Sequence, residues 1–224
     1  IRSLRGSRYT FNGFPNRSLI SPAAPSGQQN STAATTAEKQ QNLNLMRETL
    51  MKGFQTEPSV KVRSEIVYSI ANINDEPSII YLAQKYPNEA NSELKKVIIN
   101  SFGNSNFYFS TTPVAAGVAS PTVNPTGKLR FDKLLEIFRT ERDVELRRLA
   151  FGNLQRFSGW SKTEGMMDAL GQMYNSESDE QFKISLIYSL GNLTQNQQAI
   201  NKLFDIAKND KSDKMRLAAI RALQ

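Results

Sequence analysis

The sequence contains neither cysteine nor histidine. Without cysteine there are no disulfides, thiol nucleophiles or cysteine–zinc sites. Without histidine there are no serine–histidine nucleophile systems, and zinc and non-haem iron lose their ordinary imidazole ligands. The sequence therefore predicts a protein that is not an enzyme and that carries no metal and no cofactor. The compartment stays undetermined, because a lack of cysteine fits both reducing and oxidising spaces.

Two further absences narrow the function. No apolar run approaches the roughly 18 residues that a membrane span needs. Neither a GxxxxGK[ST] nor a GxGxxG phosphate-binding loop occurs. The sequence accordingly predicts no membrane span and no small-molecule substrate. Paired carboxylates could still act as acid and base, but we expect structural roles for the candidates, which are Asp143, Glu145, Glu177, Asp205 and Asp210.

Residues 1–38 form a basic, low-complexity N-terminal arm. The chain has a formal net charge of +7, and residues 1–40 contribute +4 of it, from five basic residues and one acid. Residues 21–37 offer almost nothing to bury, so this segment cannot offset its own ordering entropy. We expect an extended or disordered arm. A second hypothesis is an extended peptide that docks on a partner or on the rest of the chain, through Arg8, Tyr9 and Phe11. Ile1 in place of methionine is compatible with a processed N-terminus.

The remainder of the chain contains an internal repeat. Five segments match position by position, at 59–73, 91–105, 143–157, 179–193 and 212–224. In each of them apolar residues recur at relative positions 0, 4, 5 and 8, which lie on one face of an α-helix. These are, for example, Val62, Ile66, Val67 and Ile70. The segment starts are 32, 52, 36 and 33 residues apart, so the second interval holds one repeat and an insertion.

A second set of helical patterns lies between these segments, over residues 40–54, 77–86, 128–140, 162–175 and 197–208. Each repeat is thus a pair of helices joined by a turn. Because one pair cannot bury both of its faces, neighbouring pairs must stack. The sequence predicts an all-α fold, an α-solenoid of two-helix repeats over residues 39–224.

A charge signature accompanies the repeat. A base follows the first core position of each second helix, and an acid precedes that base by six residues. The pairs are Glu57 with Arg63, Glu89 with Lys95, Glu141 with Arg147, Glu177 with Lys183, and Asp210 with Arg216. In this pattern the chain resembles the HEAT-repeat superfamily, although four of the acids are Glu where that family favours Asp.

The resemblance implies a right-handed α-solenoid of about five HEAT-type repeats, in which the charges form a structural ladder that links successive turns. A phosphate-binding stripe is the alternative interpretation of the bases. The acid at a fixed spacing from each base favours the structural one.

Two irregularities interrupt the array. Residues 104–126 form a long insertion that carries Phe107, Tyr108 and Phe109, either as a cap on the adjacent core or as a contact element. At the other end, Gln224 aligns with Gly103 and Gly191. The last repeat therefore reads as incomplete, so that either the chain is a fragment of a longer protein or its open edge packs on another molecule.

The second helices normally line the concave face of a HEAT array, and their outward positions are candidate contacts. Tyrosine and arginine are common interface anchors, but a continuous basic stripe suited to a nucleic-acid backbone is missing. The candidates are Tyr68, Lys96, Arg148, Arg156 and Tyr188. For Trp160, the single tryptophan, we expect packing in a turn.

The sequence favours a non-enzymatic scaffold for protein–protein interaction, as a structural or assembly subunit of a larger complex. Other protein subunits would bind the concave face, the arm and the insertion. The alternative is a nucleic-acid-binding HEAT-like protein that uses the basic arm with Lys96, Arg148 and Arg156. The identity of the partner, the oligomeric state and the localisation do not follow from the sequence.

Overall fold

A computed structural model describes residues 29–103, 125–157, 159–162, 165–193 and 195–224. The chain divides into two units, residues 1–40 and residues 41–224. All regular elements in the described ranges are helices. Within residues 41–224 the helices follow one another in pairs, as the sequence predicts.

We number these pairs as repeats 1 to 5 and call the two members of each pair its A helix and its B helix. Repeat 1 comprises α1 (Gln29–Thr56) and α2 (Val60–Ile73), and repeat 2 comprises α3 (Glu76–Lys85) and α4 (Ser92–Gly103). Repeat 3 comprises α5 (Pro125–Thr140) and α6 (Val144–Leu154). Repeat 4 comprises α7 (Met166–Ser176) and α8 (Glu180–Gly191), and repeat 5 comprises α9 (Gln197–Asn209) and α10 (Asp213–Ala222). Short 3-10 helices occupy Tyr86–Asn88 and Trp160–Lys162.

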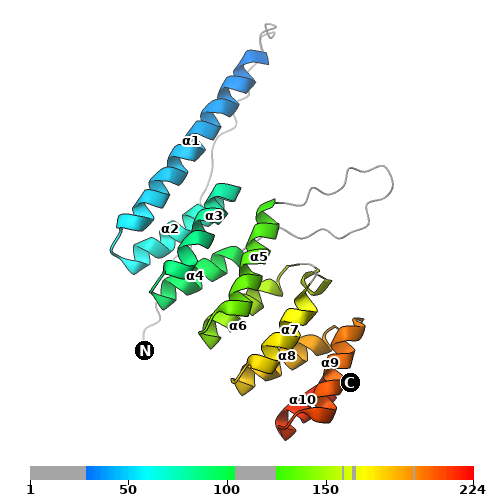
Figure 1. The fold of residues 1–224 in the computed structure, drawn as a ribbon. Coiled ribbons are helices and arrows are strands. Elements are labelled where there is room, and N and C mark those ends of the chain that lie inside the picture. Colours follow the sequence, from blue (N-terminus) through cyan, green and yellow to red (C-terminus); the bar gives the residue numbers. More distant parts are fainter. Residues whose placement is uncertain (1–28, 104–124, 158, 163–164, 194) are drawn as a thin grey trace, which may run out of the picture. The chain divides into compact units, whose positions relative to one another are not determined.

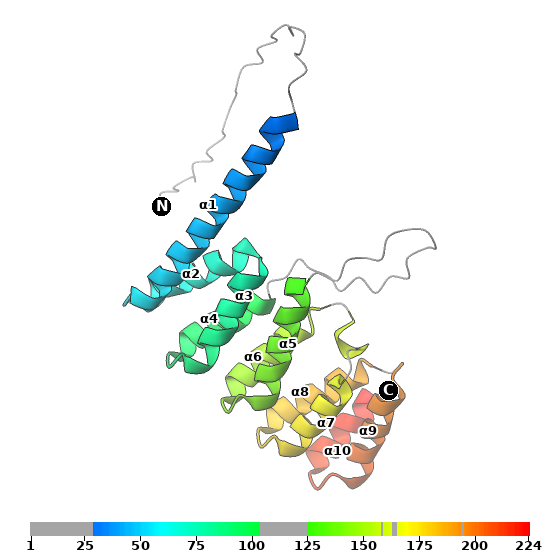
Figure 2. The same cartoon turned by 45° about the horizontal axis from the view of Figure 1, so that its top comes forward.

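The repeats stack so that their helices form two layers within residues 41–224. In Figures 1 and 2 the A helices α3, α5, α7 and α9 lie in one layer and the B helices in the other. Helices α6, α8 and α10 pack on the A helices of their own repeats, and α4 packs on both α2 and α6. Each repeat thus buries its faces against its neighbours, as in other stacked repeat proteins. The predicted α-solenoid is confirmed.

Polar side chains begin the B helices at the positions where free backbone amides need partners. Asp143 accepts from the amides of Glu145 and Leu146, and Asp179 accepts from the amide of Phe182 at 2.7 Å. Such N-caps satisfy donors that the first helical turn leaves unpaired. The short turns between A and B helices are fixed in this way.

The core follows the spacing seen in the sequence, except at the two ends of the stack. The position of Val67 is at most 3% exposed in repeats 1 to 4, yet its equivalent Ile220 in repeat 5 is 46% exposed. Conversely, Val62 in repeat 1 is 44% exposed, whereas its equivalents in repeats 2 to 5 are buried. Val62 faces away from repeat 2 and Ile220 faces away from repeat 4, so no repeat among the described residues covers either side chain.

Two helices begin elsewhere than the sequence suggests. Helix α1 begins at Gln29, although an extended arm was expected up to residue 38. Its residues 35–40 are exposed, so helix propensity supports them: alanine and glutamine favour helix, and neither Pro nor Gly occurs between Gln28 and Gly53. Helix α5 begins at Pro125, inside the expected insertion, where proline suits a first turn.

The contacts between consecutive B helices differ along the stack. At Gly191 a Cβ atom would lie 2.8 Å from the backbone oxygen of Ala222, so α8 and α10 approach closely there. Between repeats 3 and 4, aromatic rings fill the space instead: Phe151 stacks on Phe138 at 5.0 Å between ring centroids and lies 6.2 Å from Phe182. Small residues therefore set close junctions, and aromatic residues fill a wider one.

Candidate interaction surfaces

A ladder of charges runs through the turns between A and B helices. In repeats 1 to 3 the base reaches the carboxylate of the next repeat's acid, not the carboxylate of its own. Arg63 donates to Glu89 at 2.5 Å, Lys95 donates to Glu141 at 3.0 Å, and the Nε of Arg147 donates to Glu177 at 3.1 Å. Lys183 lies 4.4 Å from the centre of the Tyr174 ring, and its charge acts on Asp210.

Each acid of the ladder also holds its own turn. One oxygen of Glu89 accepts from the backbone amide of Asn91 at 2.8 Å, and Glu177 accepts in the same way from Ser178 and Asp179. In Glu89, Glu141 and Glu177 the second oxygen takes the base of the preceding repeat. A single carboxylate therefore fixes a turn and links two repeats, which explains why acid and base recur at a constant spacing.

Tyrosine hydroxyls add to the ladder at two places. Tyr86 donates to Glu141 at 2.7 Å, and Tyr174 donates to Asp210 at 2.6 Å. Burial alone would raise the pKa of Glu141, but the hydrogen bonds from Tyr86, Lys95 and the turn amides outweigh it and lower the pKa to about 2. Burial and the neighbouring carboxylate raise the pKa of each tyrosine. All four groups thus keep their ordinary protonation at neutral pH.

A buried arginine that the repeat pattern does not contain joins three helices. Arg130 on α5 is 2% exposed, and it donates to the backbone oxygen of Ala71 at 2.8 Å and to that of Ser101. It also donates to the side chain of Asn74 at 3.2 Å. These oxygens lie at the carboxyl ends of α2 and α4, where helical carbonyls lack partners and cations are favoured. Burial lowers the pKa of Arg130 to about 10, so it remains charged at neutral pH.

The B-helix positions that face away from the core include the two tyrosines that the sequence analysis singles out. Tyr68 on α2 is 36% exposed, and Tyr188 on α8 is 44% exposed. Gly152 occupies the same position on α6, with open space where a side chain would stand. Leu217 on α10 lies at a different outward position of its helix and is 52% exposed. Together these residues give the B-helix face apolar and aromatic surface.

The basic candidates on this face already have acidic partners, except one. Lys96 pairs with Glu93 at 2.8 Å, and Arg148 pairs with Glu145 and with Asp179 of the next repeat. Arg156 follows α6 and is exposed. The structure therefore neutralises much of the positive charge that a phosphate backbone would use.

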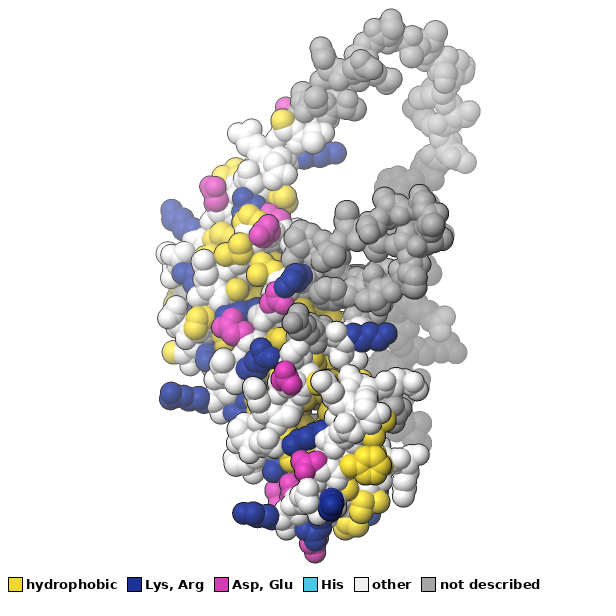
Figure 3. All heavy atoms as spheres, turned by 45° about the vertical axis from the view of Figure 1, so that its right-hand side comes forward, with side chains coloured by type: hydrophobic (Ala, Val, Ile, Leu, Met, Phe, Trp, Pro, Cys, Tyr) yellow, Lys and Arg dark blue, Asp and Glu magenta, His cyan; other side chains and the backbone are white. Residues whose placement is uncertain are grey.

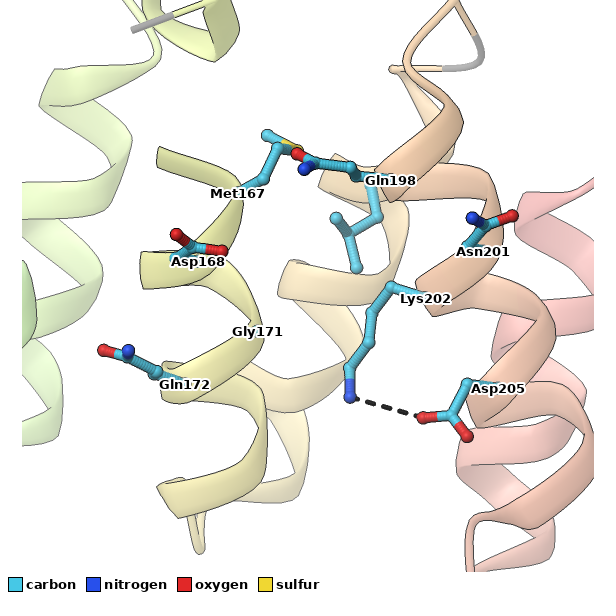
Figure 4. A pocket seen from close by; sticks show the side chains of 9 residues that line it. Met167, Asp168, Gly171, Gln172, Gln198, Asn201, Lys202 and Asp205 are labelled. Atoms are coloured by element: carbon cyan, nitrogen blue, oxygen red, sulfur yellow. Dashed lines mark hydrogen bonds and ion pairs between the residues drawn. The ribbon is translucent and has the colours of Figure 1, made fainter. Parts of the chain in front are cut away.

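The carboxylates considered as an acid–base pair each have a structural partner. Glu177 and Asp210 belong to the ladder, Asp143 caps α6, and Glu145 pairs with Arg148. Asp205 lines a groove of about 480 Å³ between α7 and α9, shown in Figure 4. There Asp205 accepts from Asn209 and from Lys202, and these contacts outweigh burial and lower its pKa. In this groove Lys202 is also held by Asn175 at 3.1 Å.

The remaining candidates divide between a packed residue and residues outside the described ranges. Trp160 meets the ring of Phe151 edge-on at 5.8 Å, so it packs in its turn. Arg8, Tyr9, Phe11, Phe107, Tyr108 and Phe109 lie outside the described residues. Within the described ranges there is no cluster of acids that could hold a metal ion and no helix long and apolar enough to cross a membrane.

The paired, stacked helices and the charged turn define an α-solenoid protein. Residues 131–224 match the family model described as HEAT repeats. This match, together with the paired helices of the whole stack, supports a HEAT-repeat superfamily assignment. No curated protein matches the chain. HEAT repeats generally mediate protein interactions.

Proposed function

We propose that this protein is a non-enzymatic scaffold that binds other protein subunits through its B-helix face. The observation that carries the proposal is the exposure of Tyr68, Tyr188 and Leu217 on the B helices of one stacked array. Large rings with a polar tip are well suited to interfaces, because they bury much area at a small entropic cost. The ladder holds these helices in register, so the surface is formed before a partner binds.

The electrostatics favour a protein partner over nucleic acid. Lys96 and Arg148 are engaged by carboxylates, which leaves Arg156 as the exposed candidate base on this side. Binding to a phosphate backbone needs several unpaired cations, since each contact contributes through release of a counterion. We propose that the N-terminal arm and residues 104–124 add contacts to the same partner.

Site-specific photo-crosslinking tests the proposal. A photoreactive phenylalanine analogue is placed at position 68 or 188, and a matched control carries it at Gln84, which is exposed on the A helix α3. We expect the analogue at 68 and at 188 to capture the same protein in the source cells, with no capture from position 84. Equal capture at all three positions, or capture of nucleic acid instead of protein, would contradict the proposal.

A further inference from the structure

The outer edge of repeat 5 carries an apolar groove that no other part of the described chain covers. Phe204 is 60% exposed and Ile220 is 46% exposed. With Ala207, Lys208, Leu223 and Gln224 they line one cavity of about 460 Å³. In Figure 3 hydrophobic side chains gather at the end of the molecule where Figure 1 places α9 and α10. Residues at the position of Ile220 are buried in every repeat that a further repeat follows.

The inner junctions show which chemistry covers such an edge, because the equivalent edge of each inner repeat is covered by the repeat that follows it. There the next repeat supplies apolar residues from its A and B helices and an acid in its turn. That acid receives the base of the preceding repeat, as Glu89 receives Arg63 and Glu141 receives Lys95. At the outer edge the corresponding base is Arg216. It donates to the backbone oxygen of Asp210 at 2.7 Å and to Asp213 three residues before it, and its side chain is 36% exposed.

The opposite edge of the same array has the complementary features. Val62 is 44% exposed and Met46 is 46% exposed. The equivalents of Met46 in repeats 2 to 5 are buried, namely Ser78, Arg130, Met166 and Ala199. These two side chains are therefore the ones that a preceding repeat would cover.

The turn acid of this edge is Glu57, and it has half of the contacts made by the other ladder acids. Its Oε1 accepts from the amide of Ser59 at 2.8 Å, as Glu89 does from Asn91. Within the ranges that the structure describes, no base reaches its second oxygen, which takes a cation in Glu89, Glu141 and Glu177.

We propose that two copies of this chain associate head to tail, with the repeat 5 edge of one copy on the repeat 1 edge of the next. Phe204 and Ile220 pack against Met46 and Val62 of the second copy, and Arg216 donates to its Glu57. The contact continues the ladder across the junction. Because the two edges differ, the association is heterologous and produces chains or rings of copies, not only dimers. This inference concerns the edges of the stack and is independent of the B-helix face.

Sedimentation velocity on the 224-residue chain over a range of concentrations tests this proposal. We expect species larger than a dimer as the concentration rises. Ile220→Asp should weaken the association at least about 10-fold, because it places a charge in an apolar contact. The matched control is Ile80→Asp, which makes the same change at an exposed isoleucine on the A helix α3 of an inner repeat. This control should associate like the unchanged chain.

Charge reversal gives a second, sharper test. Arg216→Glu and Glu57→Arg each place like charges across the junction, so each variant alone should be monomeric. An equimolar mixture should associate again, since the reversed edge of each variant then meets an opposite charge on the other. Circular dichroism shows whether each variant is folded, and Glu57→Arg leaves the contacts of Arg216 intact. A chain that is monomeric at every concentration would overturn the proposal. So would oligomers that Ile220→Asp and both reversals leave unchanged.

Discussion

Arg130 donates to the backbone oxygen of Ala71 at 2.8 Å, although the two residues belong to different repeats and Arg130 is 2% exposed. The contact places a buried positive charge at the carboxyl end of α2, and the neighbouring contact with Ser101 does the same for α4. Its Nε finds no partner among the described residues. The charge is therefore stabilised by helix ends instead of by a carboxylate.

Replacing Arg130 tests how much its contacts with the carboxyl ends of α2 and α4 contribute to the stability of the fold. Arg130→Met keeps an apolar stem of similar length but leaves the two carbonyl oxygens without a donor. We expect a loss of about 2–4 kcal/mol in the free energy of unfolding, because hydrogen bonds from a charged group are lost inside the core. Urea denaturation followed by circular dichroism measures it. The control Arg142→Met, at an exposed position, should change the stability by less than about 0.5 kcal/mol.

The ladder predicts a loss of stability in acid. The pKa of Glu141 is about 2 in the folded chain against an ordinary value of 4.5. A carboxylate with a lowered folded pKa stabilises the fold fully above its unfolded pKa, and this contribution is lost as pH falls from about 4.5 towards 2. The pKa values of Asp75, Glu177 and Asp210 are lowered as well, so the loss should be cumulative.

Glu141→Gln isolates one member of the ladder. At pH 7 this variant should be less stable than the unchanged chain by on the order of 1 kcal/mol, after allowance for solvent screening. The difference should shrink as the pH is lowered from 5 to 2, because the unchanged carboxylate is then protonated too. Urea denaturation at several pH values measures it. A difference that stays constant with pH would contradict the assigned role of Glu141.

Replacing each of two B-helix glycines with alanine should change the stability of the fold in opposite directions. Gly191→Ala places a Cβ 2.8 Å from the backbone oxygen of Ala222, so repeats 4 and 5 must separate. We expect a destabilisation of roughly 1–3 kcal/mol from overpacking. Gly152→Ala meets open space and should stabilise helix α6 by about 0.5–1 kcal/mol. Thermal unfolding of both variants checks the signs, and an equal response of the two would refute the close approach at Gly191.

The architecture could be predicted from the sequence because the repeat is periodic in several independent ways. Core spacing, the acid in the turn and the base after the first core position all recur with the helical pairs, and each reflects a contact that recurs along the stack. The ends of the stack break this rule. Val62 and Ile220 match the core pattern, but a pattern within one repeat does not indicate whether a neighbour covers it.

Features that occur once are the ones that the sequence does not indicate. Arg130 replaces residues that are small or apolar in the equivalent places, and only the three-dimensional approach of α2, α4 and α5 explains it. Similarly, the spacing of Lys96 and Arg148 suggests exposed bases, but their pairing with Glu93 and Asp179 depends on side-chain conformation and on the next repeat. The repeat spacing therefore indicates which positions face away from the core, but it does not indicate which charges are paired.

The role of the B-helix face is tested most directly by the affinity of the double variant Tyr68→Asp, Tyr188→Asp for the protein captured by photo-crosslinking. Both residues are exposed, so the fold should be retained. Isothermal titration calorimetry compares this variant with the control Gln84→Asp. We expect binding to weaken at least about 100-fold in the double variant, as for the loss of two aromatic anchors, and to be unchanged in the control. Equal affinity of the double variant and the unchanged chain would contradict the assignment of the B-helix face as the binding surface.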